Sequence, residues 1–215
     1  MDTIAAAAAR ILLDTGAVHL RPEQPFTLTS GKKSPVYVDC RKLISFTKER
    51  RILVRLMVER LQQNGVARPL AVAGGETAGI PYAAWLADAY DVPMLYVRKK
   101  PKGFGRGSQI EGVFNEGARV LLAEDLATDG GSKIVFVDAL RRAGAEVRDC
   151  IVVFHYGIYP YAGSSLEKAG IALHSLCQWR DVLALARAEA RLPKAALDKI
   201  QLFLDDPAGW AKQYG

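Results

Sequence analysis

Short apolar runs alternate with amphipathic stretches along most of the chain. The apolar runs predict buried strands over Pro69–Ala73, Val92–Val97, Val120–Ala123 and Val147–Phe154. The amphipathic stretches repeat apolar residues at helical spacing and predict helices over residues 3–13, 47–64, 79–90 and 131–143. Strands that alternate with helices in this way are typical of right-handed βαβ units. We therefore predict an α/β fold, with a mainly parallel sheet flanked by helices.

The predicted topology also indicates where a ligand would bind. In a parallel α/β sheet, ligands bind beyond the carboxyl ends of the strands. This rule places three segments together at one edge of the sheet: Gly74–Ala78, Arg98–Gly112 and Glu124–Ser132. All three are rich in glycine or in charged residues, so we expect the functional site at this edge.

Length and composition indicate one globular domain. The chain has 215 residues, of which 50% are hydrophobic and 24% charged, and its mean hydropathy is +0.04. These values exclude a disordered, collagen-like or disulfide-scaffold protein. Because no repeat or linker divides the chain, residues 1–215 are expected to form a single domain. Residues 1–45, with part of the Ala- and Leu-rich, helical-looking segment 157–215, are expected to form a small N-terminal or hood element.

The cysteines and the N-terminus indicate an intracellular location. Cys40, Cys150 and Cys177 have neither the count nor the spacing of a disulfide framework or a zinc site. Buried free thiols in a reducing compartment are therefore expected. No apolar run approaches the roughly 20 residues of a membrane span. The alanine-rich N-terminus lacks the basic start of a signal peptide and is expected to be helical, so the expected location is the cytoplasm.

The positive charge of the chain predicts an anionic partner. The net charge is +6 and the isoelectric point is near 9.3, which suits a nucleic acid, a membrane surface or a phosphorylated metabolite. Arg98–Arg106 holds five cations and no acid, with glycines interspersed. Taken alone, this segment fits a solvated loop, a nucleic-acid patch or a flexible flap that closes on a polyanion. Elsewhere cations are interspersed with acids, as in Lys48-Glu49-Arg50, and no second basic patch indicates nucleic acid.

The segment Val120–Ser132 carries the sharpest chemical signal. An apolar strand delivers two adjacent carboxylates, Glu124 and Asp125, and a Thr-x-Gly-Gly-Ser turn then leads into a helix. The backbone N–H groups of such a turn and the positive end of the helix form a phosphate cradle. The acid pair suits the two hydroxyls of a ribose, or a magnesium ion held partly through substrate oxygens. The alternative is a plain strand–turn–helix corner, with Asp129 or Ser132 capping the helix.

This segment resembles the signature by which type I phosphoribosyltransferases bind 5-phospho-α-D-ribose 1-diphosphate (PRPP). Three further blocks, in family order, resemble the orotate phosphoribosyltransferase family. Phe26–Tyr37 resembles its N-terminal segment, Val72–Pro81 its diphosphate-binding loop, and Tyr96–Gly105 with Gln109–Gly112 its mobile catalytic loop. The N-terminal block and the Arg-Lys-x-x-Lys run of the loop narrow the resemblance from the superfamily to the orotate enzymes.

The resemblance implies a reaction and a set of site residues. The reaction is the Mg²⁺-dependent transfer of phosphoribosyl from PRPP to orotate, giving orotidine 5′-phosphate and diphosphate in de novo pyrimidine biosynthesis. Catalytic roles are implied for Lys102, Arg98 and Asp125, and orotate contacts for Thr128, Tyr37 and Arg41. PRPP contacts are implied for Glu76, Thr77, Ala78, Arg98, Lys99, Lys102, Glu124, Asp125, Leu126, Ala127, Thr128, Asp129, Gly130, Gly131 and Ser132. No side chain is implied as a metal ligand, because Mg²⁺ would bridge ribose hydroxyl and diphosphate oxygens.

The resemblance also implies a homodimer with shared active sites, in which the basic loop reaches the neighbouring subunit. Its implied partners are the small-molecule substrates, with neither nucleic acid nor membrane. The sequence departs from the family where Phe104 replaces a common histidine and Thr29 a common lysine. Two alternatives stay open. The chain could be a phosphoribosyltransferase for another nucleobase, or a non-catalytic regulator that senses PRPP.

Some isolated residues have simpler interpretations. The histidines His19, His155 and His174 show no metal spacing and are expected to be structural. The tryptophans Trp85, Trp179 and Trp210 lie in apolar helical contexts and are expected in the core or at an interface. Asp39 fits either a structural ion pair with Arg41 or a contact to the base.

Overall fold

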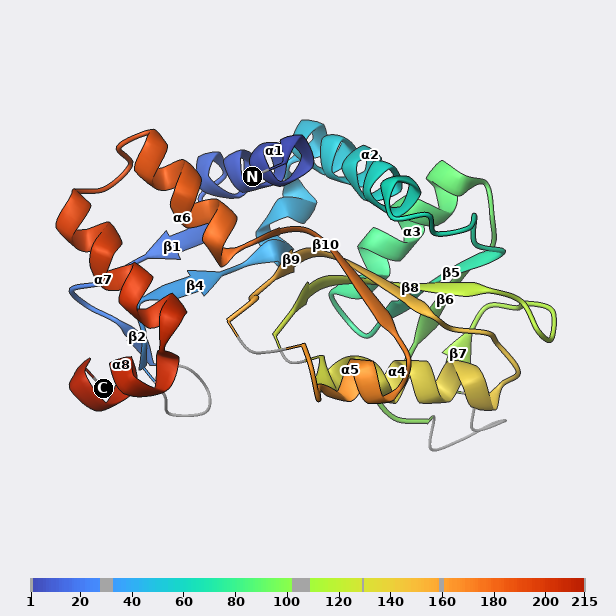
Figure 1. Cartoon of the computed structure of the whole chain (residues 1–215). Coiled ribbons are helices and arrows are strands. Elements are labelled where there is room, and N and C mark those ends of the chain that lie inside the picture. The colour runs from blue at the N-terminus through green and yellow to red at the C-terminus, as the bar shows by residue number, and fades with distance from the viewer. Residues whose placement is uncertain (1, 28–32, 102–108, 129, 159–160, 215) are drawn as a thin grey trace.

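A six-stranded sheet forms the centre of the molecule in the computed structural model (Figure 1). The structure describes residues 2–27, 33–101, 109–128, 130–158 and 161–214. The strands of the sheet are β5 (Ala71–Gly75), β6 (Met94–Val97), β7 (Ile110–Glu111), β8 (Val120–Ala127), β9 (Asp149–His155) and β10 (Ala172–Gln178). Their spatial order is β10-β9-β8-β5-β6-β7. All neighbours are parallel except β6 and β7, so the prediction of a mainly parallel α/β sheet is confirmed.

The register of the sheet brings the predicted functional segments to one edge. Gly75 at the end of β5 pairs with Val97 at the end of β6. One strand away, Ala127 at the end of β8 pairs with His155 at the end of β9. The loops that follow these strands therefore leave the sheet at the same carboxyl edge, as the sequence predicts.

Helices cover both faces of the sheet. Figure 1 shows α1 (Thr3–Asp14), α2 (Thr47–Gln63) and α3 (Gly79–Tyr90) on one face, and α4 (Gly131–Arg142) and α5 (Ser165–Lys168) on the other. Because side chains alternate along a strand, Leu121 and Ala123 of β8 pack in the core under α1–α3, whereas Val120 and Leu122 pack in the core under α4. The same alternation determines the face of the sheet toward which each of the next two residues of β8, Glu124 and Asp125, points.

Segments from the first and last parts of the chain form a lobe beside the sheet (Figure 1). The lobe contains β1 (Val18–Leu20), β2 (Phe26–Thr27), β3 (Lys33–Ser34), β4 (Val36–Val38), the 3₁₀ helix η1 (Cys40–Ser45), α6 (Trp179–Ala188), α7 (Lys194–Asp205) and α8 (Pro207–Tyr214). β1 pairs with β4 and β2 with β3, both antiparallel. α1 lies outside this lobe, along the sheet, and contacts both α6 and β10.

Several boundaries differ from the sequence prediction. β5 and β6 each begin two residues later than predicted, at Ala71 and Met94. β8 continues past Ala123 to Ala127, because β9 pairs with it as far as His155. The acid pair therefore lies inside the strand rather than at its end. The segment 157–215 is not helical throughout, since Ala172–Gln178 forms the edge strand β10. The strand predicted over Val147–Phe154 begins two residues later, at Asp149.

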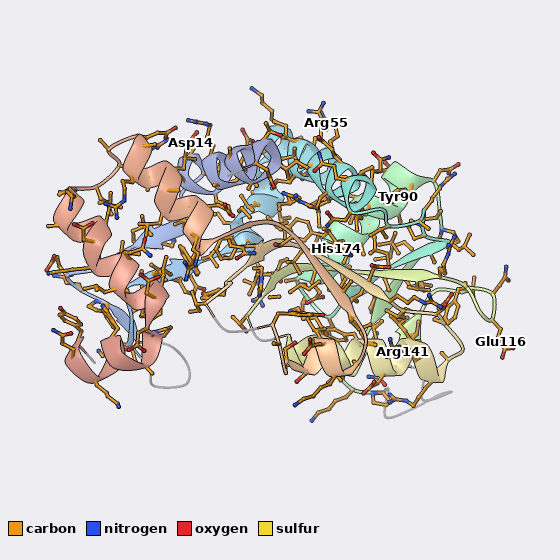
Figure 2. All side chains as sticks on the ribbon, in the orientation of Figure 1. Asp14, Arg55, Tyr90, Glu116, Arg141 and His174 are labelled. Carbon is orange, nitrogen blue, oxygen red and sulfur yellow. The ribbon has the colours of Figure 1, made fainter. Side chains whose placement is uncertain are left out.

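The isolated aromatic and histidine residues have structural surroundings. Trp179 is fully buried, with its ring edge-on to Phe154 at 5.0 Å between centroids. His174 of β10, labelled in Figure 2, is buried with one ring nitrogen 2.8 Å from Asp149 Oδ1 and the other 2.9 Å from Asn64 Nδ2. Such a ring has both nitrogens occupied, which fits the structural role expected for it. None of the described helices has the length and apolarity that a membrane crossing needs.

Candidate active site

A pocket of about 520 Å³ opens at the carboxyl edge of the sheet. β8, the start of α4 and the loops that follow β5, β6 and β8 contribute Glu76, Thr77, Ala78, Lys99, Glu124, Asp125, Leu126, Thr128 and Ser132. The lobe contributes Tyr37, Val38, Asp39, Cys40 and Arg41, and Lys133, Phe136 and Tyr156 complete the lining. The pocket thus combines residues from every part of the chain that the sequence singled out, and it carries both cations and carboxylates.

Glu124 and Asp125 approach this pocket from opposite faces of the sheet. Consecutive residues of a strand point to opposite sides, so Glu124 lies on the α4 side and Asp125 on the α3 side. Both are buried, at 6% and 5% exposed. Two adjacent carboxylates inside a strand can therefore contact one ligand from two sides. Two carboxylates on the same face of the strand would contact it from one side only.

The Glu124 carboxylate is engaged at both oxygens. Oε1 accepts a hydrogen bond of 2.9 Å from the backbone N–H of Gly75, and Oε2 lies 3.3 Å from Lys133 Nζ. Burial raises the pKa of Glu124 to about 7, against the opposing effect of the Lys133 charge. Glu124 therefore connects β8 to the loop after β5 and to the start of α4.

Asp125 occupies a different environment from its neighbour. Burial raises its pKa, while a hydrogen bond from the Leu126 backbone and the charges of Lys133 and Arg41 oppose the rise. Because Asp125 lines the pocket and is buried, an uncharged hydroxyl is a suitable partner for it. A ligand hydroxyl can donate to this carboxylate without adding charge.

The turn between β8 and α4 borders the pocket, although the predicted PRPP contacts Ala127, Gly130 and Gly131 are not among the residues that line it. α4 begins at Gly131, and its N-cap is Gly130, which has a left-handed φ of 78° and provides no side-chain cap. A Cβ on Gly130 would lie 2.3 Å from Leu166 Cδ1, so only glycine fits against α5 here. Thr128 and Ser132 line the pocket on either side of this turn. Asp129, predicted to cap the helix, lies outside the described residues.

The loop between β5 and α3 forms the next wall of the pocket. Its three residues Glu76, Thr77 and Ala78 all line the pocket, and the Glu76–Thr77 peptide bond is cis. Glu76 is held at both ends: its N–H donates to the carbonyl of Val97, and its carboxylate accepts from the N–H of Lys99. This loop is therefore tied to the start of the basic segment that follows β6.

In the described part of the basic segment that follows β6, one cation lines the pocket and another is bound outside it. Lys99 lines the pocket, but Arg98 does not. Arg98 instead donates to Glu111 Oε1 at 3.1 Å and to the Tyr96 hydroxyl at 3.0 Å. Lys102, Phe104 and Arg106 lie outside the described residues, as does Thr29 of the N-terminal block.

The lobe supplies the remaining wall. Tyr37 of β4 is 41% exposed and its ring lies near His19 and Phe26. Asp39 accepts a hydrogen bond from the backbone N–H of Arg41 and so caps η1, rather than forming the side-chain ion pair considered for these two residues. This cap leaves the Arg41 side chain directed at the pocket, close enough to affect Asp125.

Comparison with known proteins identifies the chain. An orotate phosphoribosyltransferase from Cereibacter sphaeroides is 52% identical over 210 residues, which are 97% of this chain and 90% of that protein. The chain belongs to the orotate phosphoribosyltransferase family. A search of family models found no match.

Solved structures of the family have the same fold. The orotate phosphoribosyltransferase of Aeropyrum pernix matches with a TM-score of 0.69 and 34% identity, over 82% of this chain and 97% of that one. That of Mycobacterium tuberculosis, solved in complex with PRPP, matches with a TM-score of 0.64 and 25% identity, over 83% and 98% of the two chains. The type I phosphoribosyltransferase fold predicted from the sequence is confirmed.

The pocket lining includes residues that the sequence interpretation did not assign to the site: Val38, Cys40, Lys133, Phe136 and Tyr156. Among these, Lys133 lies directly after the segment Val120–Ser132 and is only 6% exposed. The sequence does contain a signal for it: Lys133 shares the helical spacing of Phe136, Val137 and Leu140, all of which are buried. A lysine on the apolar face of a helix implies a buried partner for its charge.

The donor set of the pocket suits a metal held mainly by substrate. Among the described residues, no group of three or more His, Cys, Asp and Glu side chains comes together in the manner of a metal site. Mg²⁺ commonly keeps few protein ligands and binds through substrate phosphates and water. The residues present therefore fit an ion that arrives with a diphosphate, and they do not form a protein cage for it.

Proposed function

We propose that this chain transfers phosphoribosyl from PRPP to orotate, giving orotidine 5′-phosphate and diphosphate in pyrimidine biosynthesis. One observation carries the proposal: a single pocket is lined by the buried acid pair, by Thr128 and Ser132 on either side of the glycine turn, and by the loop after β5. Such a pocket offers separate positions for the phosphate, the ribose hydroxyls and the diphosphate of PRPP. Family membership supports the same reaction.

In this proposal the turn and the acid pair hold the phosphoribosyl group. Backbone N–H groups of residues 128–132, with the side chains of Thr128 and Ser132 and the N-terminus of α4, would bind the 5′-phosphate. Glu124 and Asp125 would accept hydrogen bonds from the two ribose hydroxyls. Departure of diphosphate leaves positive charge on the ribose, and two buried carboxylates beside it would stabilise that charge.

The diphosphate would lie against the loop Glu76–Ala78 and the basic segment. Lys99 already lines the pocket, whereas Arg98 would exchange its bond to Glu111 for one to diphosphate. Lys102 is assigned to the diphosphate from its place in the sequence, and in the homodimer proposed below the loop that carries it comes from the neighbouring subunit. Positive charge delivered at this point would neutralise the leaving group, and the loop that carries it would exclude water from the reacting centre.

Orotate would bind between the lobe and the acid pair. The Tyr37 ring offers a flat surface for the pyrimidine, and the Arg41 guanidinium suits its carboxylate. Thr128 would contribute a hydroxyl from the opposite wall. We propose that the lobe formed by β1–β4, η1 and α6–α8 is the hood of the site, because β4 and η1 carry two of these residues.

Mg²⁺ would be held by the ribose hydroxyls and diphosphate oxygens of PRPP, with Glu124 and Asp125 binding those same hydroxyls. When bound, the ion neutralises charge on the diphosphate. We further propose a homodimer in which each subunit's basic loop completes the other's site. The cytoplasm is the proposed location, because Cys40, Cys150 and Cys177 are all free and buried.

The proposal is tested by following the loss of orotate absorbance when the protein is mixed with PRPP and Mg²⁺. We expect consumption that requires both PRPP and the metal, with a no-metal reaction as the control. A lack of consumption, together with thermal stabilisation by PRPP, would overturn orotate as the acceptor. A screen of uracil, adenine and guanine would then identify a different nucleobase. PRPP binding without turnover of any base would indicate a regulator.

A further inference from the structure

A buried lysine lies at the start of α4, where its charge is unfavourable on two counts. Lys133 is the third residue of the helix, in the first turn, where the helix dipole is positive and disfavours a cation. Its side chain is only 7% exposed, so the ammonium has also lost most of its water. A lysine that is charged despite the helix dipole and the loss of water needs compensating contacts. The structure gives Lys133 Nζ two of them: Glu124 Oε2 at 3.3 Å and Ser132 Oγ at 3.4 Å.

The Glu124 carboxylate also contacts a second loop through its other oxygen. Its second oxygen, Oε1, accepts from the N–H of Gly75 at the end of β5. Two glycines make room for it: a Cβ on Gly75 or on Gly79 would lie 2.4 or 2.1 Å from Oε1. The carboxylate is therefore packed against the β5–α3 loop at a distance that side chains there would not permit.

Three elements are joined in this way beneath the pocket. Lys133 belongs to α4, Glu124 to β8 and Gly75 to β5, and each is adjacent in sequence to a segment that lines the pocket. The residue before Lys133 ends the glycine turn, and the residue after Gly75 begins the loop Glu76–Ala78. The Lys133–Glu124–Gly75 chain of contacts thus fixes the distance between the two loops.

We propose that Lys133 is a positioning residue, which holds Glu124 against Gly75 and thereby sets the glycine turn and the β5–α3 loop at the spacing that PRPP requires. The inference rests on the proposed function. PRPP has a phosphate at one end of its ribose and a diphosphate at the other, so it must contact both loops at once. A ligand that contacts one loop alone is insensitive to their spacing. Preorganised spacing therefore affects the affinity for PRPP and spares the affinity for diphosphate.

The test compares the affinities of one variant for ligands that contact either one or both of the two loops. Binding of PRPP, ribose 5-phosphate and inorganic diphosphate is measured by calorimetry on the wild type and on Lys133→Met, at a temperature where circular dichroism shows both folded. We expect Lys133→Met to lose about tenfold or more in affinity for PRPP. The affinities for diphosphate and for ribose 5-phosphate, each of which contacts one loop alone, should change by less than about twofold. A purely structural role would lower all three affinities in proportion.

A matched control and a second variant complete the test. Lys199→Met removes another lysine–glutamate pair, with Glu23 at 2.8 Å on the surface lobe, and should leave all three affinities unchanged. If Lys133→Met does not fold, Lys133→Gln, which keeps a hydrogen-bond donor, is measured instead and should show the same selective loss. Equal losses for PRPP and diphosphate, or no loss for PRPP, would overturn the positioning role alone. A wild type that does not bind PRPP would overturn the proposed function as well.

Discussion

Glu124 is the residue on which the site most depends, because it combines burial with two contacts to neighbouring elements. Burial raises its pKa from the usual 4.5 to about 7, and Lys133 and the Gly75 N–H limit the rise. The folded state therefore binds a proton at Glu124 more tightly than the unfolded state does. Stability from this group is present at low pH and is lost as the pH rises from about 4.5 through 7.

This linkage gives the first prediction. The double variant Glu124→Gln/Lys133→Met has no charge at either position, so the opposite charges of this pair are removed together, while the Arg41 charge near Asp125 remains. The unfolding free energy of the wild type minus that of this variant should fall by roughly 2 kcal/mol between about pH 5 and about pH 8. Urea unfolding at several pH values measures the difference, since the other titrating groups are common to both proteins. A difference that does not change with pH would contradict the raised pKa of Glu124.

At the scale of elements, the contact between the β5–α3 loop and β8 sets the shape of the pocket. Gly79 begins α3, and a Cβ there would lie 2.1 Å from Glu124 Oε1 and 2.6 Å from the Ala123 carbonyl oxygen. Backbone of a central strand cannot move aside cheaply, so α3 must approach β8 without a side chain at this point. The sequence showed the glycines but could not show which carboxylate they accommodate.

The second prediction follows from this close approach. Gly79→Ala should lower the free energy of unfolding by about 1–3 kcal/mol through overpacking, and should weaken PRPP binding as well. Gly209→Ala is the matched control, because its Cβ would also lie 2.1 Å from a carboxylate oxygen, that of the exposed Asp206. That side chain accepts a hydrogen bond from the Gly209 N–H at the start of α8, so its variant should lose about 1 kcal/mol with this cap but keep wild-type affinity for PRPP. Wild-type affinity for PRPP in Gly79→Ala, or an equal loss of affinity in the two variants, would contradict the role assigned to the Gly79 contact.

At the scale of the whole molecule, the sequence predicted the sheet better than the lobe. Apolar strands and amphipathic helices alternate from Thr47 onward, and this periodicity was enough to predict which loops share an edge. Strands of two or three residues, such as β2 and β3, are too short to show a periodicity. β10 was missed because His174, Ser175 and Gln178 interrupt its apolar pattern, and the partners of the His174 ring, Asn64 and Asp149, come from segments distant in sequence.

The same limit applies to the site. The loops that line the pocket could be predicted, since each follows a recognisable strand. The pairing of Lys133 with Glu124 could not, because it depends on the way α4 packs back on β8. The cap that Asp39 provides for η1 could not be predicted either, because it depends on a local turn that the composition of the segment does not specify.

The third prediction concerns the proposed homodimer. Asp125→Asn and Lys102→Ala should each abolish nearly all activity, since one removes a ribose contact and the other a cation of the loop. If the loop of one subunit completes the site of the other, mixing the two variants under conditions of subunit exchange should restore about a quarter of wild-type activity. Activity of the mixture that stays at the sum of its parts would contradict shared sites.

The most direct test of the account is a crystal structure of the protein with PRPP bound. We expect the 5′-phosphate against the backbone amides of residues 128–132, and at least one ribose hydroxyl within hydrogen-bond distance of Asp125. The diphosphate should lie along Glu76–Ala78. PRPP bound at any other place, or with its phosphate and diphosphate ends exchanged, would contradict the assignment of this pocket.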